Sequence, residues 1–100
     1  MLKILQINLQ HCKLASSNLV SILAKEDFSI VLIQEPWLGG DGKICGLKAG
    51  GFTLCHSNYS SEARIRACIL VKNNLHFLFS QELSDPDTTT IAIKQGTDTI

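Results

Sequence analysis

An acid and an amide stand at the ends of two predicted strands. Glu35 follows Gln34 and a run of four apolar residues at 30–33, and Asn8 lies in the segment LQINLQ at residues 5–10. A short apolar run predicts a strand covered on both faces, and open α/β sheets bind ligands at the edge where such strands end. A carboxylate there could hold a hard divalent cation together with waters and a phosphate, and the amide could orient a ligand. A plain surface turn would carry the same residues, so both interpretations stay open at this point.

The segments that position these two residues have the patterns of a strand, a helix and a second strand. Residues 3–9 alternate with the period of a strand, so that Gln6 and Asn8 share one face. Residues 13–27 change to helical spacing, and residues 29–34 form the second strand. This order predicts two parallel strands with the helix packed on the sheet. Asn8 and Glu35 would then lie on adjacent strands at the same edge.

Three local features of these elements can also be predicted. Pro36 lacks a backbone donor and disfavours a helical conformation in the residue before it, which predicts that the strand ends here and that Glu35 is extended. The start of the helix stays open, because residues 16–18 (SSN) could cap a shorter helix or lie on the wet face of a longer one. The apolar stripe of the helix is expected at Leu19, Ile22 and Leu23.

The later half of the chain reads as a β meander. A loop with six glycines at residues 38–51 is followed by predicted strands at residues 51–56, 64–71, 75–79 and 88–94, with turns at 72–74 and 84–87. In the second of these strands, alternate residues from Ile65 to Val71 are expected to face inward. Arg64 and Arg66 would then share the opposite face, which suits contact with a phosphate backbone. Arginines that merely keep a sheet edge soluble fit this pattern equally well.

Composition and charge exclude several classes of protein. A chain with 45% hydrophobic and 18% charged residues is that of a folded domain and not of a disordered tail. Nine basic and nine acidic residues balance, so a nucleic-acid partner would need a local patch. Four cysteines without a C-x-x-C pair argue against a zinc knuckle, and the lack of an export signal or a long apolar run predicts a soluble, intracellular protein. The histidines share no spacing and are expected to be surface or packed residues: His11, His56 and His76.

Several segments together carry a resemblance to a known family. The opening LKILQINLQHCK, the helix and IVLIQEPW resemble the start of the endonuclease/exonuclease/phosphatase superfamily. The combination closely resembles the apurinic-endonuclease-like domain at the N-terminus of reverse-transcriptase proteins of non-LTR retrotransposons. The later segments RIRACILVKNNL and TTTIAIKQGTDTI are also similar to that branch, so the resemblance covers essentially the whole chain.

This resemblance implies a fold, an activity and a set of partners. The fold would be the N-terminal part of a two-sheet α/β sandwich, with a mixed β-sheet and one main helix. The activity would be DNA nicking by a metal-dependent phosphodiesterase in which Glu35 binds Mg²⁺, or alternatively Mn²⁺, and Asn8 organises the site beside it. The implied partners are DNA, the rest of the domain and a polymerase region in the parent protein, in the nucleus or the cytoplasm.

The sequence also departs from the family pattern. The family has a Tyr in the strand that would follow residue 100, a G-D-x-N segment and a terminal S-D-H segment, and none of these groups occurs in this sequence. Residues 1–100 are therefore expected to be the N-terminal portion of a single domain whose C-terminal part is absent, and to be inactive alone. The alternatives are a non-catalytic remnant or adaptor with weak nucleic-acid or protein binding, and a phosphatase of the same superfamily.

Overall fold

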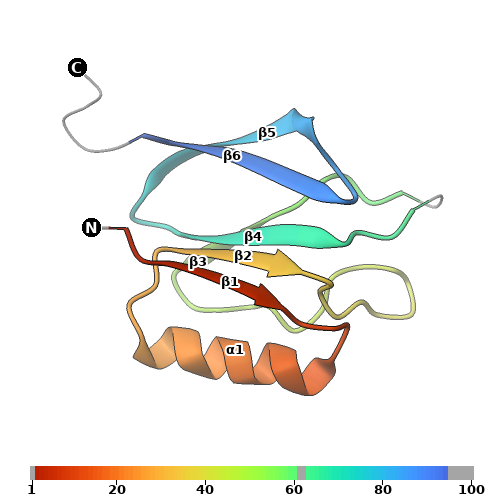
Figure 1. The fold of residues 1–100 in the computed structure, drawn as a ribbon, viewed down its shortest axis with the longest axis horizontal. Coiled ribbons are helices and arrows are strands. Elements are labelled where there is room, and N and C mark those ends of the chain that lie inside the picture. Colours follow the sequence, from red (N-terminus) through yellow and green to blue (C-terminus); the bar gives the residue numbers. More distant parts are fainter. Residues whose placement is uncertain (1, 61–62, 95–100) are drawn as a thin grey trace.

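The computed structural model describes residues 2–60 and 63–94 as three layers (Figure 1). One helix and a long loop cover one face of a four-stranded sheet, and a two-stranded hairpin covers the other face. The mixed sheet with its helix confirms the predicted α/β class. The elements in chain order are β1 (Ile4–Asn8), α1 (Lys13–Lys25), β2 (Ile30–Gln34), β3 (Phe52–Cys55), β4 (Ala67–Lys72), β5 (His76–Asp85) and β6 (Thr88–Lys94).

Strands β1 and β2 are parallel neighbours, as the sequence predicted. Their register places Ile4 opposite Ile30 and Asn8 opposite Gln34. Because the two strands run in the same direction, their last residues meet at one edge of the sheet, at the right in Figure 1. The predicted proximity of the residues that follow these strands therefore has its basis in the sheet itself.

Helix α1 is the longer of the two helices that the sequence allowed. It begins at Lys13 after the N-cap residue Cys12, which makes no side-chain cap, so residues 16–18 lie inside the helix. Within the predicted stripe, the prediction for Ile22 was wrong, because this residue remains 40% exposed at the border of the packed face. The residues that α1 buries against the sheet are Ser16, Leu19 and Leu23.

Strand β4 is buried on both faces, which the alternation of the sequence did not predict. Cys68 and Leu70 belong to the cluster on the helix side of the sheet, whereas Ile69 and Val71 belong to the cluster on the hairpin side. Burying a Val, Leu or Ile side chain stabilises the folded state by about 1.5–3 kcal/mol relative to leaving it exposed. The prediction of a single inward face was wrong, because the hairpin covers the predicted face with Ile69 and Val71, while the helix and the loop cover the other face with Cys68 and Leu70.

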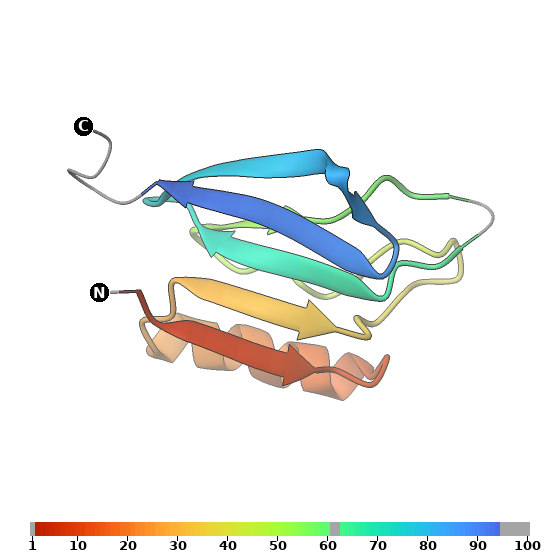
Figure 2. The same ribbon diagram turned by 45° about the horizontal axis from the view of Figure 1, so that its top comes forward.

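The predicted meander is confirmed for the antiparallel pairs β3–β4 and β5–β6 and is wrong for β4 and β5, which lie in different sheets. The sheet order is β1-β2-β4-β3, so β4 lies between β2 and β3, and β5 pairs only with β6 in a second sheet. Figure 2 shows this hairpin running beside β4. Both predicted turns are present: residues 73–75 connect β4 to β5, one residue later than the predicted 72–74, and Asp85 pairs with Thr88 across a two-residue turn. No helix in the described part of the chain is long and apolar enough to cross a membrane.

Candidate functional site

The structure brings Asn8 and Glu35 into direct contact. The side-chain Nδ2 of Asn8 donates a hydrogen bond to Oε2 of Glu35 at 2.6 Å. The other end of the amide is fixed as well, because Oδ1 of Asn8 accepts a hydrogen bond from the backbone N–H of Gln10 at 2.8 Å. A carboxylate at the end of β2 is thus oriented by an amide at the end of β1.

His11 contacts the second oxygen of the same carboxylate. Its Nε2 lies 3.4 Å from Oε1 of Glu35, and its Nδ1 lies 3.1 Å from the carbonyl oxygen of Pro36. Its backbone N–H also donates to the carbonyl of Glu35 at 2.9 Å. The spacing of the histidines predicts an ordinary surface or packed residue at position 11 and does not predict this contact. The available signal was its position three residues after Asn8, in a loop at the same sheet edge.

The backbone of Glu35 is left-handed, with a φ of +49°. The prediction that Pro36 makes Glu35 extended was therefore wrong, although β2 does end at Gln34 as expected. The backbone N–H of Glu35 donates to the carbonyl of Arg66 at 2.8 Å, while its carbonyl accepts from His11. These two bonds hold a conformation that costs a residue with a side chain about 1–3 kcal/mol.

Gln10 and His11 share this uncommon conformation, with φ values of +51° and +55°. Such residues cluster at functional sites, where the surrounding structure enforces the geometry. All three positive φ values of described residues other than glycine thus occur in the two loops that form this edge of the sheet.

A divalent cation would find few protein ligands at this edge. The side chains of Glu35 and His11 are 43% and 51% exposed, so both are open to solvent. Within residues 2–60 and 63–94, no group of three or more His, Cys, Asp or Glu side chains could hold a metal ion. One carboxylate and its neighbours fit a hard cation such as Mg²⁺, which keeps several waters and binds one or two carboxylates plus a substrate phosphate.

Arg64 and Arg66 do not lie on a strand face, so that prediction was wrong. β4 begins at Ala67, and residues 63–66 are irregular. Arg66 has a structural role: its carbonyl accepts from Glu35, its N–H donates to the carbonyl of Pro86 at 2.6 Å, and its Nε lies 3.4 Å from Oδ1 of Asp87. Arg64 is exposed. The segment before β4 therefore links the carboxylate loop to the hairpin turn.

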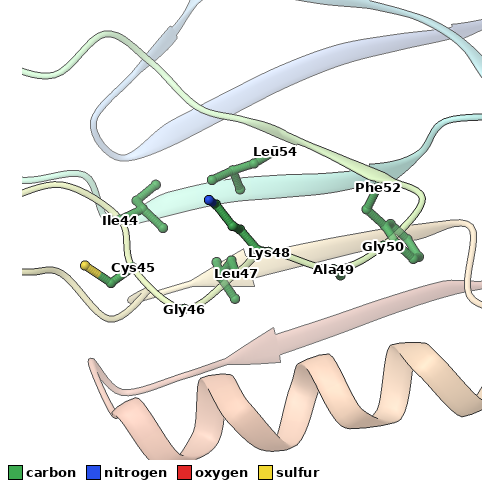
Figure 3. A pocket seen from close by; sticks show the side chains of 9 residues that line it. All are labelled: Ile44, Cys45, Gly46, Leu47, Lys48, Ala49, Gly50, Phe52 and Leu54. Atoms are coloured by element: carbon green, nitrogen blue, oxygen red, sulfur yellow. The ribbon is translucent and has the colours of Figure 1, made fainter.

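Two cavities and the buried thiol of Cys68 are further features of the described residues. A mostly apolar cavity of about 830 Å³ is formed by the loop at residues 44–50 with Phe52 and Leu54 (Figure 3), and a smaller one of about 220 Å³ lies between Gln34 and the start of β6. Neither is lined by Glu35. Burial, and then the neighbouring Cys55, raise the pKa of Cys68 to about 12, so its thiolate is scarcely present at neutral pH.

Comparison with solved structures confirms the resemblance that the sequence indicated. The fold is similar to that of the endonuclease domain of TRAS1, a telomere-specific non-LTR retrotransposon, with a TM-score of 0.75 and 26% sequence identity. The match covers 94% of this chain and 40% of the TRAS1 chain, so the chain spans less than half of the structure that it matches. The chain matches no protein-family model and no curated protein.

Proposed function

We propose that this chain forms the cation-binding portion of a DNA endonuclease of the retrotransposon type. The observation that carries the proposal is the hydrogen bond of Asn8 to the exposed carboxylate of Glu35, at the edge where two parallel strands end. The similarity to the TRAS1 endonuclease domain supports the reaction class and DNA as the substrate. In this proposal residues 1–100 are the N-terminal portion of one domain.

In this proposal Glu35 and Asn8 have different roles at the cation. Glu35 would hold Mg²⁺ or Mn²⁺ through Oε1, because Oε2 already accepts the hydrogen bond from Asn8. The bound ion supplies Lewis-acid polarisation of a phosphoryl oxygen and neutralises charge on the leaving oxygen. Asn8 keeps the carboxylate in one orientation, so little reorganisation is needed when a phosphodiester arrives.

Arg64 would supply a phosphate contact that positions the DNA without reading its sequence. Its guanidinium is exposed at the start of the segment that leads into β4. Arginine forks match phosphate oxygens in geometry and charge. Arg66 would contribute less, because Asp87 already lies beside its guanidinium.

Cleavage itself is expected to need groups beyond those of this chain. A phosphodiesterase of this kind needs a base to activate water and residues that orient the phosphate, and the G-D-x-N and S-D-H motifs that supply them in the family do not occur in the sequence. The chain is therefore expected to bind a cation and DNA without nicking DNA by itself.

The test separates cation binding from cleavage. Calorimetric titration with Mg²⁺ is expected to show binding that is lost in Glu35→Gln and kept in the matched control Glu26→Gln, whose carboxylate lies 3.6 Å from Lys3 on a different part of the surface. Supercoiled plasmid with Mg²⁺, with and without EDTA, is expected to remain intact. Unchanged cation binding in Glu35→Gln would rule out the proposed site.

The remaining outcomes distinguish the alternatives. Cation-dependent nicking that disappears in Glu35→Gln would support the endonuclease and overturn the expectation of inactivity. DNA binding without any cation binding would favour the non-catalytic adaptor. Release of phosphate from a small ester, with plasmid left intact, would favour a phosphatase of the same superfamily.

A further inference from the structure

The tautomer of His11 is set by its contact with Pro36. A carbonyl oxygen can only accept a hydrogen bond, so Nδ1 of His11, 3.1 Å from the carbonyl oxygen of Pro36, must carry a hydrogen. In the neutral ring, Nε2 then carries a lone pair and no hydrogen. In this neutral form the lone pair faces Oε1 of Glu35 at 3.4 Å with no hydrogen between the two atoms, whereas in a protonated ring Nε2 would donate a hydrogen bond to the same oxygen.

A cation bound by both Nε2 of His11 and Oε1 of Glu35 would make their proximity favourable, because it attracts both lone pairs. Nitrogen and oxygen ligands lie about 2.0–2.2 Å from their metal, which at angles of about 90–109° separates neighbouring ligand atoms by about 2.8–3.6 Å. The separation of 3.4 Å between Nε2 and Oε1 falls in this range. We infer that His11 is a second protein ligand of the cation at Glu35, an inference that rests on the proposed cation site.

The surrounding hydrogen bonds use the other polar atoms of the two side chains and leave Nε2 of His11 and Oε1 of Glu35 to bind a cation. Oε2 of Glu35 is occupied by the amide of Asn8, which directs Oε1 toward His11. The His11 ring is held by its Nδ1 bond, and the His11 backbone by the bond from its N–H to the carbonyl of Glu35 at 2.9 Å. An imidazole whose other nitrogen donates to a carbonyl is the usual arrangement of a metal-binding histidine. Both side chains are about half exposed, which leaves room for waters and a phosphate.

A nitrogen ligand changes which cation the site prefers. Mg²⁺ favours oxygen ligands, whereas imidazole also suits transition metals, whose affinities follow the Irving–Williams order. The pair of Nε2 and Oε1 therefore shifts the preference of this site toward Mn²⁺, compared with the same site without the histidine.

The experiment measures binding and not activity. At a pH above the ordinary pKa of histidine, Mn²⁺ affinity is measured from the loss of the free-ion electron paramagnetic resonance signal, and Mg²⁺ affinity from competition. His11→Asn keeps an amide donor near the position of Nδ1 and removes Nε2, and the exposed His76 provides the matched control His76→Asn. We expect His11→Asn to weaken Mn²⁺ binding about tenfold, the lower end for an altered ligand shell, with little change for Mg²⁺ and no change in the control.

A spectroscopic readout shows whether the nitrogen touches the ion. Electron spin echo modulation from imidazole ¹⁴N is expected on bound Mn²⁺ in the unaltered chain and absent in His11→Asn, with circular dichroism confirming that the variant folds. Equal weakening for both ions, or an unchanged ¹⁴N signal, would overturn the inference. Binding that Glu35→Gln abolishes and His11→Asn leaves intact would defeat this inference alone. No binding of either ion to the unaltered chain would defeat the proposed cation site as well.

Discussion

Glu35 serves the site through its side chain and the fold through its backbone. The carboxylate meets Asn8 and His11, while the left-handed backbone is bonded to Arg66 and His11. These two roles can be separated by comparing two substitutions. Both variants lose the carboxylate, but they differ in how easily they adopt the left-handed backbone conformation.

Glu35→Gly is expected to be more stable than Glu35→Ala by about 1 kcal/mol. Both variants lose the carboxylate contacts, but at a φ of +49° only glycine avoids the clash of a Cβ atom with the backbone. Urea denaturation measures the difference in the free energy of unfolding. The control pair is Glu26→Gly and Glu26→Ala at a φ of −108°, where alanine is expected to be the more stable. The same order at both positions would contradict this account.

Residue types identified part of the site, and loop geometry determined the rest. Asn8 and Glu35 could be found from the sequence because each comes at the end of a recognisable strand. His11 could not, because it reaches the carboxylate only through the left-handed turn at Gln10 and His11. The contact of Arg66 with Asp87 joins the segment before β4 to the hairpin turn, a pairing that no local pattern indicates.

The loop between β2 and β3 packs tightly on α1 at a glycine. A Cβ atom on Gly46 would lie 3.0 Å from Cε3 of Trp37 and 3.4 Å from Cβ of Ser16, and its φ is +76°. Lys13 of the helix places its Nζ 5.7 Å from the centre of the Trp37 ring. The indole is thereby held between the helix and the loop.

Gly46→Ala is expected to destabilise the fold by about 1–3 kcal/mol more than Gly42→Ala, because it forces the tightly packed Trp37 to shift. Gly42 is a matched control, since its φ is +79° but a Cβ atom added to it would meet no atom within 4 Å beyond its chain neighbours. Both variants carry the same backbone cost, so the difference isolates packing. Urea denaturation followed by tryptophan fluorescence measures it, and equal losses would show that only the backbone conformation matters.

An ion pair between Asp27 and Lys72 joins the helix-to-β2 connection to the end of β4. The hydrogen bond from Lys72, and then its charge, lower the pKa of Asp27 below the usual 3.8. Because the folded pKa is depressed, the stabilisation is complete above 3.8 and is lost as the pH falls through the lower folded value. Asp27→Asn is expected to reduce the fall in stability at acid pH. Thermal unfolding measured from neutral pH to below 3.8 would show this difference. An unchanged fall in stability would contradict the coupling.

Elements with a local signature and the pairing of neighbouring strands were predicted well, whereas the order of the whole sheet was not. β1, α1 and β2 follow from periodicity and from the preference for parallel β-α-β units. The position of β4 between β2 and β3 depends on which apolar faces pack together in the folded chain. The local sequence RIRACILV does not indicate that a second layer covers this strand. The burial of both faces of β4 could therefore be seen only in the assembled structure.

At the scale of the whole molecule, the proposed DNA binding would depend on the placement of charge and not on its total, since the formal net charge is zero. Arg64→Ala is expected to weaken binding to a duplex oligonucleotide and to reduce the slope of log affinity against log salt by about one. Arg66→Ala is expected to have a smaller effect, because Asp87 already offsets its charge.

Fluorescence anisotropy over a range of salt concentrations measures both slopes. The control is Lys25→Ala, which removes one positive charge from the exposed last residue of α1, in the helix layer and not in the sheet layer into which the segment before β4 leads (Figure 1). An equal effect of Lys25→Ala would mean that general charge, and not the segment before β4, attracts the DNA.

The hydrogen bonds that fix Glu35 also determine when the site can form during folding. The backbone N–H of Glu35 donates a hydrogen bond to the carbonyl of Arg66, and the N–H of Arg66 donates to the carbonyl of Pro86. The carbonyl of Glu35 accepts a hydrogen bond from the N–H of His11. Segments far apart in the chain must therefore meet before the carboxylate is in place, and closing such loops is slow compared with forming a helix. Competence to bind a cation should thus arise late in refolding, well after the circular dichroism signal of α1, so a bound Mn²⁺ ion would report the final assembly of the three layers.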